Sequence, residues 1–138
     1  MAESTAPSIP GAEEVIQWFG EWPSFSDAEI LGLNLRRDGR SSIRVHSWRM
    51  TSEVNAQGHY VLDRHAVVTV WLEGISDLEL GDFSSQNVIG NLDIKPHESG
   101  FRVTLWPIYG VGGHIDAARV TLSLEPGKPG DATNHAEA

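Results

Sequence analysis

The chain has 138 residues, no cysteine, and 19 acidic against 10 basic residues, which gives a formal net charge of -9. This length suffices for one domain with its own hydrophobic core, and the lack of cysteine excludes disulfides, thiol catalysis and cysteine-based zinc sites. The acidic balance argues against nucleic-acid binding, because phosphate groups repel it, and favours a basic protein partner.

Both ends of the chain have the composition of disordered tails. Residues 1–8 are small and polar, and residues 125–138 are rich in Gly, Pro and Ala without apolar periodicity. We therefore expect a single folded domain over residues 9–124. The beginning of the chain lacks the basic and apolar regions of a signal peptide, and no run approaches the roughly 18 apolar residues of a membrane span. A cytoplasmic protein without membrane contact is expected.

One helix is predicted, over residues 11–19. Its apolar side chains share one broad face, and Gly20 stands where a helix C-terminus is expected to stop. The chain then turns at Trp22-Pro23 into the first strand. Large aromatic side chains of this kind usually anchor a core. The predicted contact between this region and the sheet consists of Trp18, Phe19, Trp22 and Phe25 on one side and Leu31, Leu33 and Val70 on the other.

From residue 30 the apolar pattern has a period of two, which is typical of strands. Residues 37–40 form a turn, so the first strand is predicted to pair with a second strand over residues 43–50. Further strands are predicted over 60–73, 87–95, 100–106 and 115–124, and the segment after Gly74 is interpreted as an excursion between sheet segments. The expected fold is mainly β (α+β): one N-terminal helix packed on an antiparallel sheet or sandwich of six to seven strands.

The sequence predicts no catalytic residues, no cofactor and no metal site. His46, His59 and His65 lie on different predicted segments, and no HxH, HxxxH or HExxH spacing is present. No phosphate-binding glycine motif precedes a helix. Asp27 and Glu29 could share one strand face as a carboxylate pair, but we favour a structural role for Asp27 in capping backbone amides at the turn.

The charges are segregated along the sequence, which favours oriented docking of a basic protein. Basic residues gather in the predicted hairpin around residues 36–49, whereas long acidic windows flank it on both sides. The residues expected to contact a partner are Glu21, Trp22, Asp27, Glu29, Asp77, Glu79 and Asp82. We expect the protein to be a monomer or a weak homodimer.

Three segments resemble the immunity protein 50 family of bacterial polymorphic toxin systems. They are FGEWPSFSDAEIL at residues 19–31, the hairpin pair LNLRRD and VHSWRMTSEV, and DLELGDFSSQNVIGNLDI at 77–94. The resemblance spans roughly residues 15–124. In that family the WPSF segment tends to be followed by His-Asp-Ala-Glu, and Ser26 replaces the histidine here, which argues against a catalytic or metal role for the segment. The resemblance implies a non-enzymatic antitoxin that binds a cognate toxin domain and blocks it.

An alternative function remains open from the residues alone. A small-ligand or hydrolytic β-domain could use a concave sheet face lined by Trp48, Trp71 and Trp106. A strand tryptophan is more often part of a core than of a ligand cage. Polar groups converging among these three rings would favour the alternative.

Overall fold

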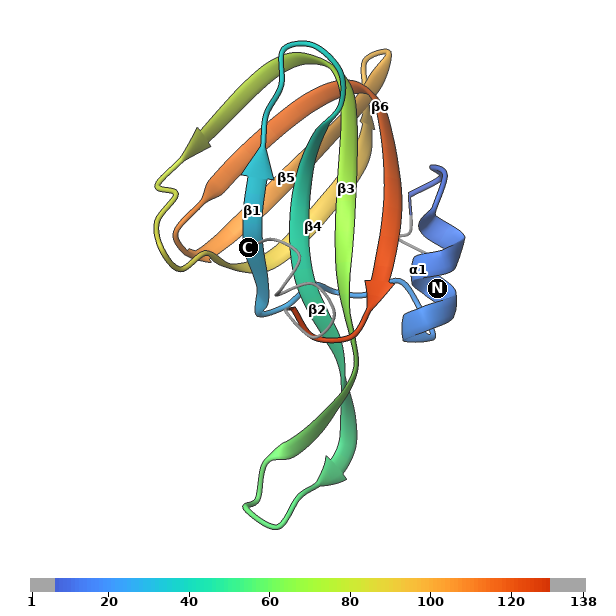
Figure 1. Cartoon of the computed structure of the whole chain (residues 1–138), viewed down its shortest axis with the longest axis vertical. Coiled ribbons are helices and arrows are strands. Elements are labelled where there is room, and N and C mark those ends of the chain that lie inside the picture. Colours follow the sequence, from blue (N-terminus) through green and yellow to red (C-terminus); the bar gives the residue numbers. More distant parts are fainter. Residues whose placement is uncertain (1–6, 130–138) are drawn as a thin grey trace.

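Six antiparallel strands close into a barrel in the order β1-β2-β3-β6-β5-β4, and one helix packs beside it (Figure 1). The structure is a computed structural model and describes residues 7–129. The predicted antiparallel sheet is confirmed, with six strands, and it closes on itself as a barrel. The elements are α1 (Ala12–Phe19), β1 (Ala28–Asn34), β2 (Ser41–Val54), β3 (Tyr60–Gly81), β4 (Val88–His97), β5 (Gly100–Tyr109) and β6 (Gly112–Pro126).

Helix α1 lies where the sequence predicts it. Gly20 ends it in the left-handed conformation (φ 90°), and its N–H donates to the Ile16 carbonyl at 2.7 Å. The Leu122 N–H donates to the Pro10 carbonyl, which fixes the start of the helix beside β6. Val15 and Phe19 are buried, so the apolar face of α1 joins the barrel core. Among the described residues, no helix is long and apolar enough to cross a membrane.

β3 and β6 bend sharply, so each takes part in two differently oriented parts of the barrel. The first part of β3 pairs with β2 and with the end of β6, whereas its last part pairs only with the start of β6. Gly74 (φ 70°) lies at the bend, where an added Cβ would come within 2.9 Å of the Ala118 Cβ. The predicted excursion after Gly74 is therefore wrong, because glycine lets the strand turn the corner without leaving the ladder.

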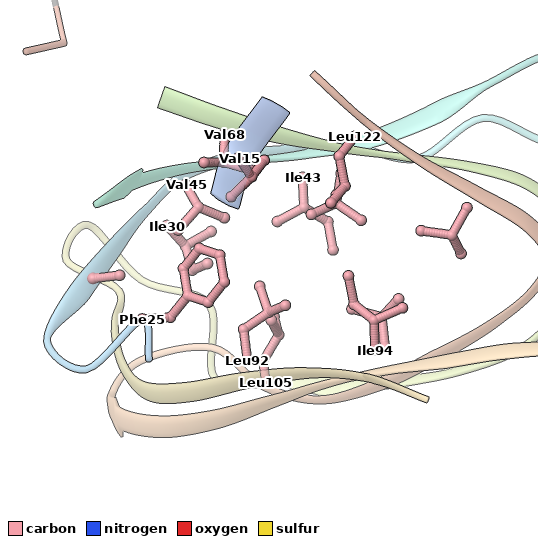
Figure 2. Close-up of a cluster of buried hydrophobic side chains, with 14 of the residues drawn as sticks. Val15, Phe25, Ile30, Ile43, Val45, Val68, Leu92, Ile94, Leu105 and Leu122 are labelled. Carbon is pink, nitrogen blue, oxygen red and sulfur yellow. The ribbon is translucent and has the colours of Figure 1, made fainter. Parts of the chain in front are cut away.

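Aliphatic side chains from all six strands fill the barrel (Figure 2). Phe19 and Phe25 are 2% exposed, as predicted, but Trp18 and Trp22 are only partly buried at the edge of the core. The buried positions of β1 are Ala28 and Ile30, after which the register with β2 shifts between Ile30 and Gly32. This bulge exchanges the two faces of the strand.

The predicted contact of the aromatic cluster with Leu31, Leu33 and Val70 therefore holds only in part. Val70 is fully buried and Leu33 is partly buried against the core, whereas Leu31 is only partly buried and does not belong to the core cluster. Ala28 and Ile30 occupy the core positions that the period-two pattern assigned to the leucines.

The ordered chain extends beyond the expected domain boundary. β6 continues to Pro126 because Glu125 pairs with Val67 and Pro126 with Ala66. The Gly127 N–H then donates to the His65 carbonyl. The composition of this stretch resembles a tail, but its backbone completes the β3–β6 ladder. Residues 1–6 and 130–138 of the predicted tails lie outside the described part of the chain.

Candidate protein-binding surface

One side of the barrel presents a broad polar face built from four neighbouring strands. The strands lie in the order β3-β6-β5-β4, with β3 contributing only the segment after its bend. Inward side chains such as Leu92, Leu105 and Ile115 are buried, so the residues between them point outward. We call this surface the exposed sheet face. Its residues are Asp77, Glu79, Asn91, Asp93, Lys95, Arg102, Thr104, Trp106, His114 and Asp116.

The pairing register arranges these residues in rows across the four strands. Asp77 pairs with Asp116, which pairs with Arg102, and Arg102 pairs with Lys95. The adjacent row contains Glu79, His114, Thr104 and Asp93 in the same order. Acidic side chains therefore lie at both outer strands of the face, and residues distant in the sequence share one surface.

An ion pair between Arg102 and Asp116 lies on this face near the bend. Arg102 Nε and Nη2 donate to the two Asp116 carboxylate oxygens at 2.7 and 2.9 Å, and the Asp116 side chain is 9% exposed. His97 Nε2 lies 3.6 Å from the same carboxylate. The Arg102 hydrogen bonds are the main reason that the pKa of Asp116 is lowered from its ordinary 3.8. Asp116 is thus held as a carboxylate and has a structural role in the face.

Asp77, His114 and Asp116 bring three potential metal ligands together, with ligand atoms within 4.8 Å of one another. His114 Nε2 lies 3.1 Å from Asp77 Oδ2. Both oxygens of Asp116 already accept hydrogen bonds from Arg102, however, and the guanidinium charge would repel a divalent cation at this carboxylate. The chemistry of the group therefore suits an ion-pair network better than a cation site.

Trp106 is the most prominent apolar group of the exposed sheet face. Its residue surface is 52% exposed, and its Nε1–H donates to Asp93 Oδ2 at 3.0 Å, which fixes the ring against β4. Ile108 and Tyr109 follow on the same strand with 52% and 61% exposure. Neighbouring exposed apolar groups on a rigid strand are typical of a protein-binding surface.

A groove lies beside the free edge of β4, next to the exposed sheet face. Its volume is about 410 Å³. One wall is the segment Glu21–Ser24, which connects α1 to β1, and the other is Asn91–Lys95 of β4. The Trp22 ring meets the Phe25 ring edge to face at 5.7 Å, which attaches the first wall to the core.

The structure divides the predicted partner-binding residues into three places. Asp77 and Glu79 lie on the exposed sheet face, and Asp82 follows directly after β3. Glu21 and Trp22 line the groove. The remaining two acidic residues lie at the start of β1 beside the start of β4.

At that start of β1, the Asp27 backbone N–H donates to the Ile89 carbonyl, and Glu29 pairs with Val88 and His46. Asp27 has a positive φ of 66°. The Asp27 backbone thus ends the β1 ladder at the turn before the strand. A structural role of Asp27 at this turn is compatible with the interpretation of the residue from the sequence.

The three tryptophans of the alternative function lie in separate surroundings. The Trp48 ring contacts the His46 and His65 rings, whereas Trp71 Nε1 donates to Ser123 and its ring lies under the Arg40 guanidinium. Trp106 lies on the exposed sheet face. Since aliphatic side chains fill the barrel interior, the three rings do not line a common cavity.

Sequence reasoning missed Arg102, His114 and Asp116, which meet only across the β3–β6 and β5–β6 pairings. It also missed the contact between His46 Nε2 and His65 Nδ1, which are 3.1 Å apart. The signal that could have revealed the first group is alternation, because all three lie at outward positions of strands with strong apolar periodicity.

Comparison with known families adds one finding. The family model described as immunity protein 50 matches residues 11–124, which include α1 and nearly all of the barrel. No curated protein and no solved structure matches the chain significantly. The chain belongs to the immunity protein 50 family.

Proposed function

We propose that this immunity protein is a non-enzymatic inhibitor that binds a cognate bacterial toxin domain through the exposed sheet face and occludes it. The observation that carries the proposal is the exposed Trp106, which is held by Asp93 on a sheet and bordered by further exposed apolar residues. Tryptophan is the residue most enriched among those that dominate binding energy at interfaces. Since the sheet backbone fixes the ring in advance, binding costs little ordering of this side chain.

The charge of the exposed sheet face supports a basic partner. It carries four carboxylates, at Asp77, Glu79, Asp93 and Asp116, against the cations of Lys95 and Arg102. Arg102 is neutralised by Asp116, and Lys95 balances Asp93 on β4, which leaves the acidic excess of Asp77 and Glu79 on β3. Nucleases commonly carry basic surfaces because they approach phosphate. A nuclease toxin of a polymorphic system is the partner that this charge fits best, with carboxylates taking the place of phosphates.

The proposed site of action is the cytoplasm of the producing cell, where a monomer meets the toxin before it causes damage. Occlusion needs only binding. The groups on the exposed sheet face that could do chemistry are engaged with one another, as in the Arg102–Asp116 pair and the contact of His114 with Asp77. These contacts favour a binding role over catalysis.

The test is binding to the toxin domain encoded beside the protein's gene, measured by calorimetry for the wild type and for Trp106→Ala. A hot-spot tryptophan contributes at least about 2 kcal/mol, so we expect Kd to rise roughly 30-fold or more. Val54→Ala is the matched control, because Val54 is a similarly exposed apolar residue (58%) at the end of β2, near the tip of the β2–β3 hairpin. Equal affinity of the Trp106→Ala variant and the wild type would place the interface elsewhere.

A further inference from the structure

We propose that the groove beside β4 binds an extended segment of the toxin, which pairs with the β4 edge as an additional strand. The identity of the partner rests on the proposed function. The inference concerns a different part of the surface, however, namely the backbone edge of β4 and not its outward side chains. It also specifies a different kind of contact, made by main-chain hydrogen bonds.

The edge of β4 is open over most of its length. β4 pairs with β5 from Val88 to His97, but on its other side it pairs with β1 only at Val88 and Ile89. Just before β1 the Asp27 N–H still donates to the Ile89 carbonyl, but the segment Glu21–Phe25 runs past β4 without pairing, because Pro23 has no N–H and Phe25 has a left-handed backbone (φ 59°). Among the described strands, none pairs with Asn91–Lys95 on this side.

The backbone of this edge points into the open space. The Leu92 N–H donates to its neighbour's side-chain oxygen, Asn91 Oδ1, at 2.9 Å and thus not to β5. In an antiparallel pair, peptide groups two residues apart point to the same side. The N–H and C=O of Ile94 therefore face the same way as those of Leu92. A row of such groups is a template for pairing with another strand.

The groove has the shape that strand addition requires. Five consecutive β4 residues, Asn91–Lys95, line it. A cleft over one face of a strand would be lined by alternate residues only, so this groove runs along the edge. Five residues of strand span about 16 Å, the length of a short extended peptide. The volume of about 410 Å³ also lies in the range of pockets that hold ligands.

The walls indicate which segment fits. The charged residues of the lining are Glu21, Asp93 and Lys95, two acidic and one basic, so a segment with a basic side chain is favoured. Trp22 supplies an apolar wall that can pack against a β-branched or apolar side chain. In strand addition the main-chain hydrogen bonds give affinity and the pockets for alternate side chains give specificity. The occupant is thus an extended segment of the toxin that mixes basic and apolar residues.

Amide hydrogen exchange of the immunity protein, free and bound to the toxin domain encoded beside its gene, tests the inference directly. We expect exchange of the Leu92 and Ile94 amides to slow at least 10-fold in the complex, because both become ladder hydrogen bonds. A complex that forms with unchanged exchange at both amides would overturn strand addition and leave the proposed function intact. Absence of any complex would overturn both.

A second experiment fills the groove with a bulky side chain and measures the affinity for the toxin domain. Ser24→Trp places a bulky side chain in the wall opposite β4, and we expect the affinity for the toxin domain to fall at least 10-fold. Gln57→Trp is the control, since Gln57 lies exposed in the β2–β3 hairpin turn, which projects away from the barrel (Figure 1). Equal affinities of the two variants would contradict binding in the groove.

Discussion

Phe25 offers the sharpest test of how the segment before β1 is held in the core. Phe25 is 2% exposed and belongs to the same buried cluster as Ile30, Val45 and Leu92 (Figure 2). An aromatic side chain of this size buries on the order of 150–200 Å². At about 25 cal/mol per Å² the burial contributes roughly 4–5 kcal/mol. Phe25→Ala should therefore lower the free energy of unfolding by about 3–5 kcal/mol, which corresponds to a decrease in Tm of roughly 10–20 °C for a domain of this size.

The backbone of Phe25 adds a second, independent expectation. Its φ of 59° lies in the left-handed region, which costs an L-residue about 1–2 kcal/mol but costs glycine nothing. Phe25→Gly should therefore be no less stable than Phe25→Ala, the reverse of the usual order. Urea unfolding followed by circular dichroism measures both variants. Phe83→Ala is the control, because Phe83 is 57% exposed and its removal should change the stability by about 0.5 kcal/mol at most. If Phe25→Ala lowers the free energy of unfolding by no more than Phe83→Ala does, Phe25 does not anchor this segment in the core.

Two further predictions concern the Arg102–Asp116 network. Because Arg102 lowers the pKa of Asp116 below 3.8, the pair stabilises the fold above that pH, and this contribution is lost as the pH falls through the lowered pKa. In urea unfolding across acid pH the wild type should thus lose stability more steeply than Asp116→Asn, and parallel pH profiles would refute the linkage. Removing metal with a chelator should leave the unfolding midpoint unchanged, because the Asp116 oxygens are occupied by Arg102; a fall of several degrees would instead indicate a bound cation at Asp77, His114 and Asp116.

The sequence was informative where local patterns decide the structure. The helix end at Gly20 and the turn that joins the first two strands follow from glycine placement, and Gly39 adopts a positive φ of 89° in that turn. The register of β1 could not be predicted, because the bulge after Ile30 depends on its pairing with β2. The bend of β3 at Gly74 equally depends on close packing against Ala118.

The binding surface was predictable only in part, for the same reason. Asp77 and Glu79 stood out by their charge, but their neighbours on the exposed sheet face come from β4, β5 and β6. From the sequence alone Trp106 is a pocket residue only in the alternative function, and a core position is favoured for it, because a lone tryptophan on a strand gives no sign of which face is covered. Strand pairing, which brings together distant parts of the chain, decides that question.

The most direct test of the central claim is the association rate with the toxin domain across ionic strength, measured by stopped-flow fluorescence. Asp77→Lys with Glu79→Lys reverses two charges on the exposed sheet face, whereas Glu13→Lys with Glu14→Lys makes the same change in net charge on α1. If the toxin docks on the exposed sheet face, association of the wild type slows steeply with salt, and the first variant associates at least about 10-fold more slowly than the second at low salt. Equal rates for the two variants, or a wild-type rate that does not respond to salt, would contradict electrostatic docking on this face.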